Sequence, residues 1–304
     1  MRILFIFVDG IGLGDNDPKS NPFAAADLPT LHSLTAGQRW LRATGRAESA
    51  RSTLIPTDAC LGVGGRPQSA TGQAALLTGI NVPKVLGYHY GPKPDVLVAA
   101  IVRQNNFIRD LAARGLPLNF LNAYPPAFFE SIRNGKRLLS SNQLAIHTAG
   151  VPLHGKEALY EGRALSADFT GEGWRTLLGY PDAPILSPFE AGQRMARLAM
   201  EYRLTFFDHW VTDYVGHRGT MDEAIRRLKV LDEVLAGILE EWDDVAGLVV
   251  LTSDHGNLED LSTRGHTTNP VPTLVIGKER QAFAEGLSDL TDLAPRLRRA
   301  LLAS

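Results

Sequence analysis

Continuous apolar runs that end at polar residues are the clearest pattern along this chain. The first run, Arg2–Val8, is rich in β-branched and aromatic residues and leads directly to Asp9. Such runs are typical of strands in a parallel sheet that is covered on both faces, with functional residues at the carboxyl ends of the strands. Three later runs have the same form: Leu204–Phe207 before Asp208, Gly247–Leu251 before Asp254, and Thr273–Ile276.

Between these runs, apolar residues recur at helical spacing. Over Thr220–Trp242 they fall on one face, with Glu and Arg on the other, which predicts a long amphipathic helix packed on the sheet. Further helices are expected at Phe189–Arg203 and at Asp292–Leu302, the second begun by Thr291. The alternation predicts an α/β fold with a mostly parallel sheet between helices.

The middle of the chain has a different composition. Residues 82–187 are rich in Pro and Gly, and their periodicities are short and weak. A segment of about 100 residues is long enough for a small domain. We therefore expect a core formed by residues 1–81 and 188–304, with a small inserted cap domain at 82–187.

Net charge limits the kinds of binding partner, and cysteine content bears on disulfides and cellular location. A formal net charge of -2 gives no global field that would attract nucleic acid or an anionic membrane. Cys60 is the only cysteine, so intramolecular disulfides are impossible and a cytoplasmic location is expected. The apolar run Ile3–Val8 is too short to span a membrane and has no cleavage site after it. Nothing in the sequence fixes the number of subunits.

Polar residues with metal-binding chemistry follow several of the predicted strands. Asp254 and His255 are adjacent and leave a strand, offering one carboxylate oxygen and one imidazole nitrogen, a mixed set that suits Zn, Mn or Fe. Asp213 and His217 are four residues apart, a spacing that lets both reach one metal, with Gly216 allowing the backbone a close approach to an ion. His266 precedes another strand. Each of these motifs alone could be an ordinary turn or a structural histidine. The prediction of a metal site rests on all of them occurring at strand ends.

A candidate nucleophile lies before a run of small residues. Ser69 stands at the start of a predicted helix, where free backbone N–H groups and the helix dipole stabilise an anion. The competing interpretation is an ordinary capping serine. Thr71 is the rival nucleophile.

In order along the chain, these segments resemble the alkaline phosphatase superfamily, and most closely its cofactor-independent phosphoglycerate mutase and phosphopentomutase branch. The resemblance covers Met1–Gly79 and about Phe189–Ala303. It is carried by four motifs: Val8-Asp9-Gly10, Asp213-Tyr214-Val215-Gly216-His217, Asp254-His255-Gly256-Asn257, and His266 to Pro272.

The resemblance implies two divalent metal ions, Mn or Zn. Asp213, His217 and His266 would bind one ion, and Asp9, Asp254 and His255 would bind the other. Ser69, which would also contact the second ion, matches the position that is phosphorylated in these mutases. Two departures stand out: Gln73 replaces the family's histidine, and the cap is much shorter than the inserted domain of the phosphoglycerate mutases.

These features predict an enzyme that transfers a phosphoryl group from a small phosphorylated metabolite through a phosphoserine. We prefer a phosphatase because the short cap is poorly suited to a mutase. The alternatives are a phosphomutase, a phosphodiesterase, or a metal-binding protein without activity. A sulfatase is disfavoured because Cys60 lacks the following Pro and Arg of that family's motif. In addition to Thr71, four residues of the cap are candidates for substrate contact: His89, Arg133, Lys136 and Arg137.

Overall fold

A seven-stranded sheet forms the centre of the computed structural model, which describes residues 1–303. The strands are β1 (Arg2–Val8), β2 (Ala47–Glu48), β3 (Ser52–Thr57), β4 (Leu118–Phe120), β5 (Leu204–His209), β6 (Gly247–Thr252) and β7 (Val271–Ile276). Their order across the sheet is β2-β3-β7-β6-β1-β5-β4. The four runs singled out in the sequence are all strands, and three of the four occupy the centre of the sheet.

Most strands of the sheet run in one direction. β1 pairs in parallel with β5 and β6, and β4 pairs in parallel with β5. β7 is antiparallel to both β6 and β3, so β3 points the same way as the parallel group and β2 points against it. The predicted mostly parallel α/β sheet is confirmed. Because β7 is reversed, its first residues lie at the edge where β1, β5 and β6 end.

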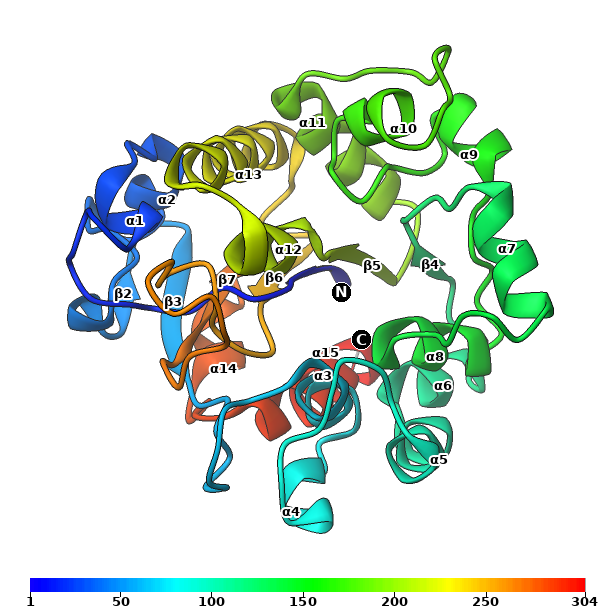
Figure 1. The fold of residues 1–304 in the computed structure, drawn as a ribbon, viewed down its shortest axis with the longest axis horizontal. Helices are drawn as coiled ribbons and strands as arrows, with labels where there is room; N and C mark the ends of the chain where they lie inside the picture. The colour runs from blue at the N-terminus through cyan, green and yellow to red at the C-terminus, as the bar shows by residue number, and fades with distance from the viewer. Residues whose placement is uncertain (304) are drawn as a thin grey trace.

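Helices cover both faces of this sheet (Figure 1). On one side lie α1 (Pro22–Ala25), α2 (Pro29–Ser33), α11 (Pro188–Ala199), α12 (Val211–Arg218) and α13 (Met221–Glu241). The other side has α3 (Ser69–Thr78), α5 (Val96–Asn105), α6 (Phe107–Ala112), α8 (Ser141–Thr148), α14 (Arg280–Ala284) and α15 (Leu293–Leu302). Shorter helices complete the chain: α4 (Val82–Leu86), α7 (Pro126–Arg133), α9 (Lys156–Tyr160) and α10 (Glu172–Thr176).

The apolar run of β1 explains why two cores form. Successive side chains of a strand point to opposite faces, so a strand covered on both faces needs apolar residues at every position. Ile3, Phe5 and Phe7 belong to the core under α3. Leu4, Ile6 and Val8 belong to the core under α13. Both sets are fully buried, as the sequence pattern predicts.

The predicted helices are present, with shifted ends. Thr220 caps α13 through a capping box with Glu223. α11 ends at Ala199, four residues before the predicted Arg203, because the chain must turn there into β5. The expectation that Thr291 begins the last helix is wrong: the Asp289 side chain accepts from the Thr291 backbone N–H and caps a short 3-10 turn that precedes α15.

The segment 82–187 does not lie wholly outside the sheet. β4 falls within it and pairs with β5, and α5, α6 and α8 share the core of α3. A separate small apolar cluster gathers Ala123, Ala158, Leu159, Ala164, Trp174 and Ala183. This cluster lies with α9 and α10 at the periphery of the molecule (Figure 1). The division into core and cap stays a prediction, since other residues between 123 and 183 belong to the two main cores.

Within the described residues, no helix combines the length and the apolar character that crossing a bilayer requires.

Two glycines allow α11 and α13 to cross at close range. A Cβ on Gly192 would lie 2.0 Å from the Val234 carbonyl oxygen, and a Cβ on Gly237 would lie 2.0 Å from that of Phe189. Side chains cannot be accommodated at such distances without moving a backbone. The tight crossing fixes α13 against α11.

We expect Gly237→Ala to destabilise the protein by about 1–3 kcal/mol, the usual cost of overpacking a core, because the added methyl group meets a backbone carbonyl. The measurement is the thermal unfolding midpoint by circular dichroism. Gly64→Ala is the matched control, since a Cβ there has open space around it. An unchanged midpoint for Gly237→Ala would show that the two helices are not packed as described.

Candidate metal centre and nucleophile

Three aspartates meet at the carboxyl edge of the sheet. Asp9 directly follows β1, and Asp254 follows β6 after a single intervening residue. Asp213 lies in the first turn of α12, the helix that follows β5. Because these strands are parallel neighbours, their carboxyl ends place the three side chains together. His266 joins them because β7 starts at the same edge.

His217 and His266 face each other with their lone pairs. His266 Nδ1 lies 2.7 Å from the Pro67 carbonyl oxygen, and His217 Nδ1 lies 3.0 Å from that of Arg264. A carbonyl oxygen only accepts, so each Nδ1 carries the hydrogen and each Nε2 is left as an acceptor in the neutral ring. The two Nε2 atoms are 3.2 Å apart. Two acceptors at this distance call for a cation between them.

Asp213 completes this first group. Its two carboxylate oxygens lie 3.4 Å from His217 Nε2 and 3.6 Å from His266 Nε2. The Asn257 amide donates to Asp213 Oδ1 at 2.7 Å and fixes the carboxylate. A Cβ on Gly216 would lie 2.6 Å from Cγ of Asn257. Gly216 therefore allows the Asn257 amide to come close to the backbone. The sequence analysis expected this glycine to allow the approach of an ion instead.

His255 is the centre of a second group. Its Nε2 lies 3.4 Å from Asp9 Oδ1 and 3.6 Å from Asp254 Oδ2. Its ring stacks on that of His266, with centroids 3.6 Å apart, so the two groups are contiguous. The six predicted ligands therefore lie together, although their role as ligands stays a prediction.

Burial sets the protonation of this cluster. Removal from water raises the pKa of Asp9 well above its usual range, with a further contribution from Asp254, whose own pKa burial raises to about 7. Burial lowers the pKa values of His255 and His266 to about 4. Both imidazoles are therefore neutral near pH 7, which is the form that binds a metal.

The donor atoms fit two divalent cations. One ligand atom from each of Asp213, His217 and His266 lies within 4.8 Å of the others, and the same holds for Asp9, Asp213 and His255. Asp9 Oδ1 and Asp254 Oδ1 are buried and have no hydrogen-bond partner among residues 1–303. Carboxylates and imidazoles without a thiolate suit Mn and Zn, and a cation would neutralise the two unpaired oxygens.

Ser69 lies beside this cluster, at the first position of α3. The cap position is Gln68, and Ser69 Oγ lies 3.0 Å from His255 Nε2. The competing interpretation as a capping serine is therefore wrong. Thr71 Oγ1 instead accepts from the Tyr90 N–H at 3.1 Å and contacts the Tyr90 carbonyl oxygen at 3.2 Å. Its hydroxyl is engaged with the backbone.

Gln73 has a defined place in the site. Its Nε2 donates to Asp254 Oδ2 at 3.2 Å, and its Oε1 accepts from the Asn142 backbone N–H at 3.4 Å. Gln73 thus supports a candidate ligand from the helix that carries Ser69. The amide supplies a neutral donor where the family has an imidazole.

Glu259 is a supporting residue that the sequence interpretation missed. Its buried carboxylate accepts from the backbone N–H groups of Gly12 and Asn257 at 2.9 and 2.8 Å. It also accepts from Thr267 and from the Asn269 amide, the latter at 3.0 Å. Glu259 joins the loops on either side of His255 and His266 to the loop after Asp9. The sequence offered one sign of this role: Glu259 is an acidic residue two positions after Asn257, in a segment otherwise predicted to bind metal.

Within residues 1–303, no hydrogen bond or ion pair joins the four remaining candidates to the six ligands. His89 Nε2 is 3.3 Å from the Val63 carbonyl oxygen. Lys136 is exposed, and no hydrogen bond or ion pair within residues 1–303 joins its side chain to the cluster. The Arg137 guanidinium lies 5.1 Å from the Phe128 ring centroid. A contact of these residues with substrate stays a prediction.

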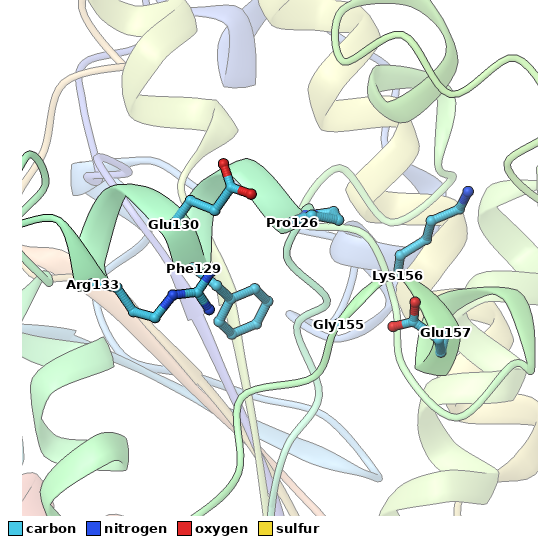
Figure 2. Close-up of a pocket in the computed structure, with 7 residues that line it drawn as sticks. All are labelled: Pro126, Phe129, Glu130, Arg133, Gly155, Lys156 and Glu157. Atoms are coloured by element: carbon cyan, nitrogen blue, oxygen red, sulfur yellow. The ribbon is translucent and has the colours of Figure 1, made fainter.

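Arg133 lines a different cavity. Figure 2 shows it with Phe129 and Glu130 of α7 on one side and Lys156 and Glu157 of α9 on the other. The cavity has a volume of about 240 Å³, and no candidate metal ligand contributes to its wall. Arg133 is therefore placed away from the cluster.

Comparison with known proteins agrees with the fold and with the C-terminal motifs. Residues 190–301 match the family described as "Metalloenzyme superfamily". A phosphoglycerate mutase from Leishmania mexicana has a similar fold, with a TM-score of 0.57 and 10% identity over 99% of this chain and 95% of that one. A cold-active alkaline phosphatase from Shewanella gives a TM-score of 0.54 and 12% identity over 99% of this chain and 100% of that one. Residues 190–301 thus match a metalloenzyme family model, and the fold is similar to that of a phosphoglycerate mutase and of an alkaline phosphatase.

Several curated sequence relatives share one name. Two 2,3-bisphosphoglycerate-independent phosphoglycerate mutases illustrate the similarity. The one from Methylobacillus flagellatus is 32% identical over 39% of this chain, and the one from Vibrio vulnificus is 28% identical over 58%. These matches span 25% and 37% of the relatives' lengths, respectively. Each match therefore covers only part of this chain and a smaller part of the relative.

Asp213 lies within both groups of candidate donor atoms, so we expect Asp213→Asn to reduce bound metal at both positions, because it would remove a ligand of one proposed cation and a negative charge adjacent to the other. His217→Ala should reduce it at one position only. The two variants are compared by elemental analysis for metal content and by anomalous scattering for the position of each ion. Asp222→Asn, an exposed aspartate on α13, is the control. Full metal content in Asp213→Asn would contradict the shared role.

Proposed function

We propose that this chain transfers a phosphoryl group from a small phosphorylated metabolite to Ser69 and then to water, as a metal-dependent phosphatase. The observation that carries the proposal is the position of Ser69 Oγ, 3.0 Å from His255 Nε2 at the start of α3. A hydroxyl there adjoins both the candidate metal ligands and the N–H groups of a helix terminus.

The proposed metal sites follow from the donor groups. Asp213, His217 and His266 would hold one divalent cation, and Asp9, Asp254 and His255 the other, with Ser69 next to the second. When bound, the two cations lower the pKa of the serine hydroxyl and neutralise charge on the phosphoryl oxygens. Mn and Zn are the proposed ions because no thiolate is present to select a softer metal.

The proposed reaction has two displacements. Ser69 Oγ forms a bond to phosphorus while the ester oxygen leaves, and the proton lost by the hydroxyl balances the one gained by the alcohol. Water then forms the second bond to phosphorus, Ser69 Oγ leaves, and inorganic phosphate is released. The Ser69 and Ala70 N–H groups at the start of α3 would face the developing negative charge, whereas the Thr71 N–H is bound to the Tyr90 carbonyl oxygen.

A mutase is the second candidate, favoured by the names of the curated relatives. A mutase must enclose its intermediate and keep water away from the phosphoserine while the substrate reorients. The separate apolar cluster of the predicted cap, formed by Ala123, Ala158, Leu159, Ala164, Trp174 and Ala183, is small. So small a cap favours the phosphatase.

Ser69→Ala should lower turnover of a phosphate ester at least about 10³-fold, because it removes the attacking oxygen. Metal content should remain close to that of the unmodified protein, since six ligand side chains are unchanged. Thr71→Ala, which removes the rival hydroxyl and its hydrogen bonds to the Tyr90 backbone, should lower activity less than Ser69→Ala does. Loss of activity in Thr71→Ala with retention in Ser69→Ala would reverse the assignment.

Hydrolysis and isomerisation can be followed together by phosphorus NMR on one preparation loaded with Mn or Zn. We expect inorganic phosphate to appear from small phosphate esters, with little or no interconversion of 2- and 3-phosphoglycerate, because the short cap leaves the phosphoserine open to water. Isomerisation of phosphoglycerate or a pentose phosphate without release of phosphate would establish the mutase instead.

A further inference from the structure

The segment Tyr90–Lys93 lies against the first turn of α3. The Thr71 N–H donates to the Tyr90 carbonyl oxygen at 3.1 Å, and the Tyr90 N–H donates to Thr71 Oγ1 at 3.1 Å. A Cβ on Gly91 would lie 3.2 Å from the Ser69 nitrogen. The backbone of this segment therefore runs directly past the candidate nucleophile, and Lys93 follows two residues later.

Lys93 is a half-buried lysine without an ionic partner. None of the salt bridges within residues 1–303 includes it. Burial lowers the pKa of its ammonium group, and the charges of Asp208 and Asp9 oppose that shift. The contacts of Tyr90 and Gly91 with the first turn of α3 place the segment that carries Lys93 at the edge of the sheet where Ser69 lies.

The groups around Lys93 are polar, buried and rigidly held. Asp208 ends β5, where the Asn122 side chain binds both its backbone N–H and its carbonyl oxygen at 2.8 Å. The Asn142 side chain is fully buried and faces Asp208, and its amide lowers the pKa of that carboxylate, which burial raises to about 7. Asn142 and Asp208 thus form a buried polar pair close to the carboxyl end of β5.

We propose that Lys93 is a catalytic residue that binds an oxygen of the phosphoryl group transferred at Ser69. The inference rests on the proposed phosphoryl transfer and adds a residue to it. Phosphoryl oxygens that do not face the metal ligands need another positive group, and a lysine ammonium is a compact cation suited to phosphate. Asp208 lies near enough to orient the ammonium, and the Asn142 amide offers a further donor.

Arg137 is the other cation near this position. Its charge acts on Lys93, which places the two side chains near one another. Arg137 is exposed and its guanidinium lies over the Phe128 ring, whereas Lys93 is held by a segment bound to α3. Lys93 is therefore the cation that the fold fixes beside Ser69.

The test measures binding of inorganic phosphate by calorimetry to metal-loaded protein that carries Ser69→Ala, which separates binding from turnover. We expect Lys93→Ala to weaken phosphate binding about 10- to 100-fold, the range for a hydrogen bond to a charged group. Lys93→Arg should retain most of the affinity. Lys84→Ala, an exposed lysine on α4, is the matched control and should bind as the parent does.

Several outcomes would overturn the assignment of Lys93. These are equal phosphate affinity in Lys93→Ala and Lys84→Ala, loss of metal from Lys93→Ala by elemental analysis, or no phosphate binding by the metal-loaded parent. Absence of turnover in the protein with Ser69 intact would instead refute the proposed phosphoryl transfer. Phosphate binding that depends on Lys93 would then stand as a separate property of the site.

Discussion

Buried negative charge at one edge of the sheet is the constraint on which the site depends. Asp9 and Asp254 are almost or fully excluded from water, and each has a carboxylate oxygen that no group in residues 1–303 hydrogen-bonds. An isolated buried carboxylate costs several kcal/mol unless it is neutralised or paired. The parallel strands that bring these groups together therefore create a site whose charge is balanced by cations.

The residues around the cluster hold it in place with neutral donors. Gln73 and Asn257 each donate an amide hydrogen to an aspartate, and backbone carbonyls fix the tautomers of His217 and His266. Such outer partners orient ligands without adding positive charge that would compete with a metal. Glu259 connects the loops behind them. These contacts hold the candidate ligands in place before any ion binds.

The sequence predicted the parts of the structure that depend on local pattern. The apolar runs of β1, β5, β6 and β7 were evident, and the motifs after them placed six polar residues at one edge. β4 has only three residues, and β3 contains Pro56, so neither has a recognisable run. Lys93 and Asn142 are isolated polar residues in segments of weak pattern. Only the fold brings them to the site, which is why sequence reasoning missed both.

The central place of β1 has a consequence for how the protein folds. Ile3 pairs with Leu204 on one side and with Leu248 on the other, so both neighbours of this strand come from much later in the chain. During synthesis, the apolar residues of β1 must therefore wait until residue 204 is made before β5 begins, and until residue 247 before β6 begins. Long-range parallel pairing is slow and leaves such segments open to aggregation. Chaperones that shield apolar segments should therefore matter most for this protein while it is still on the ribosome.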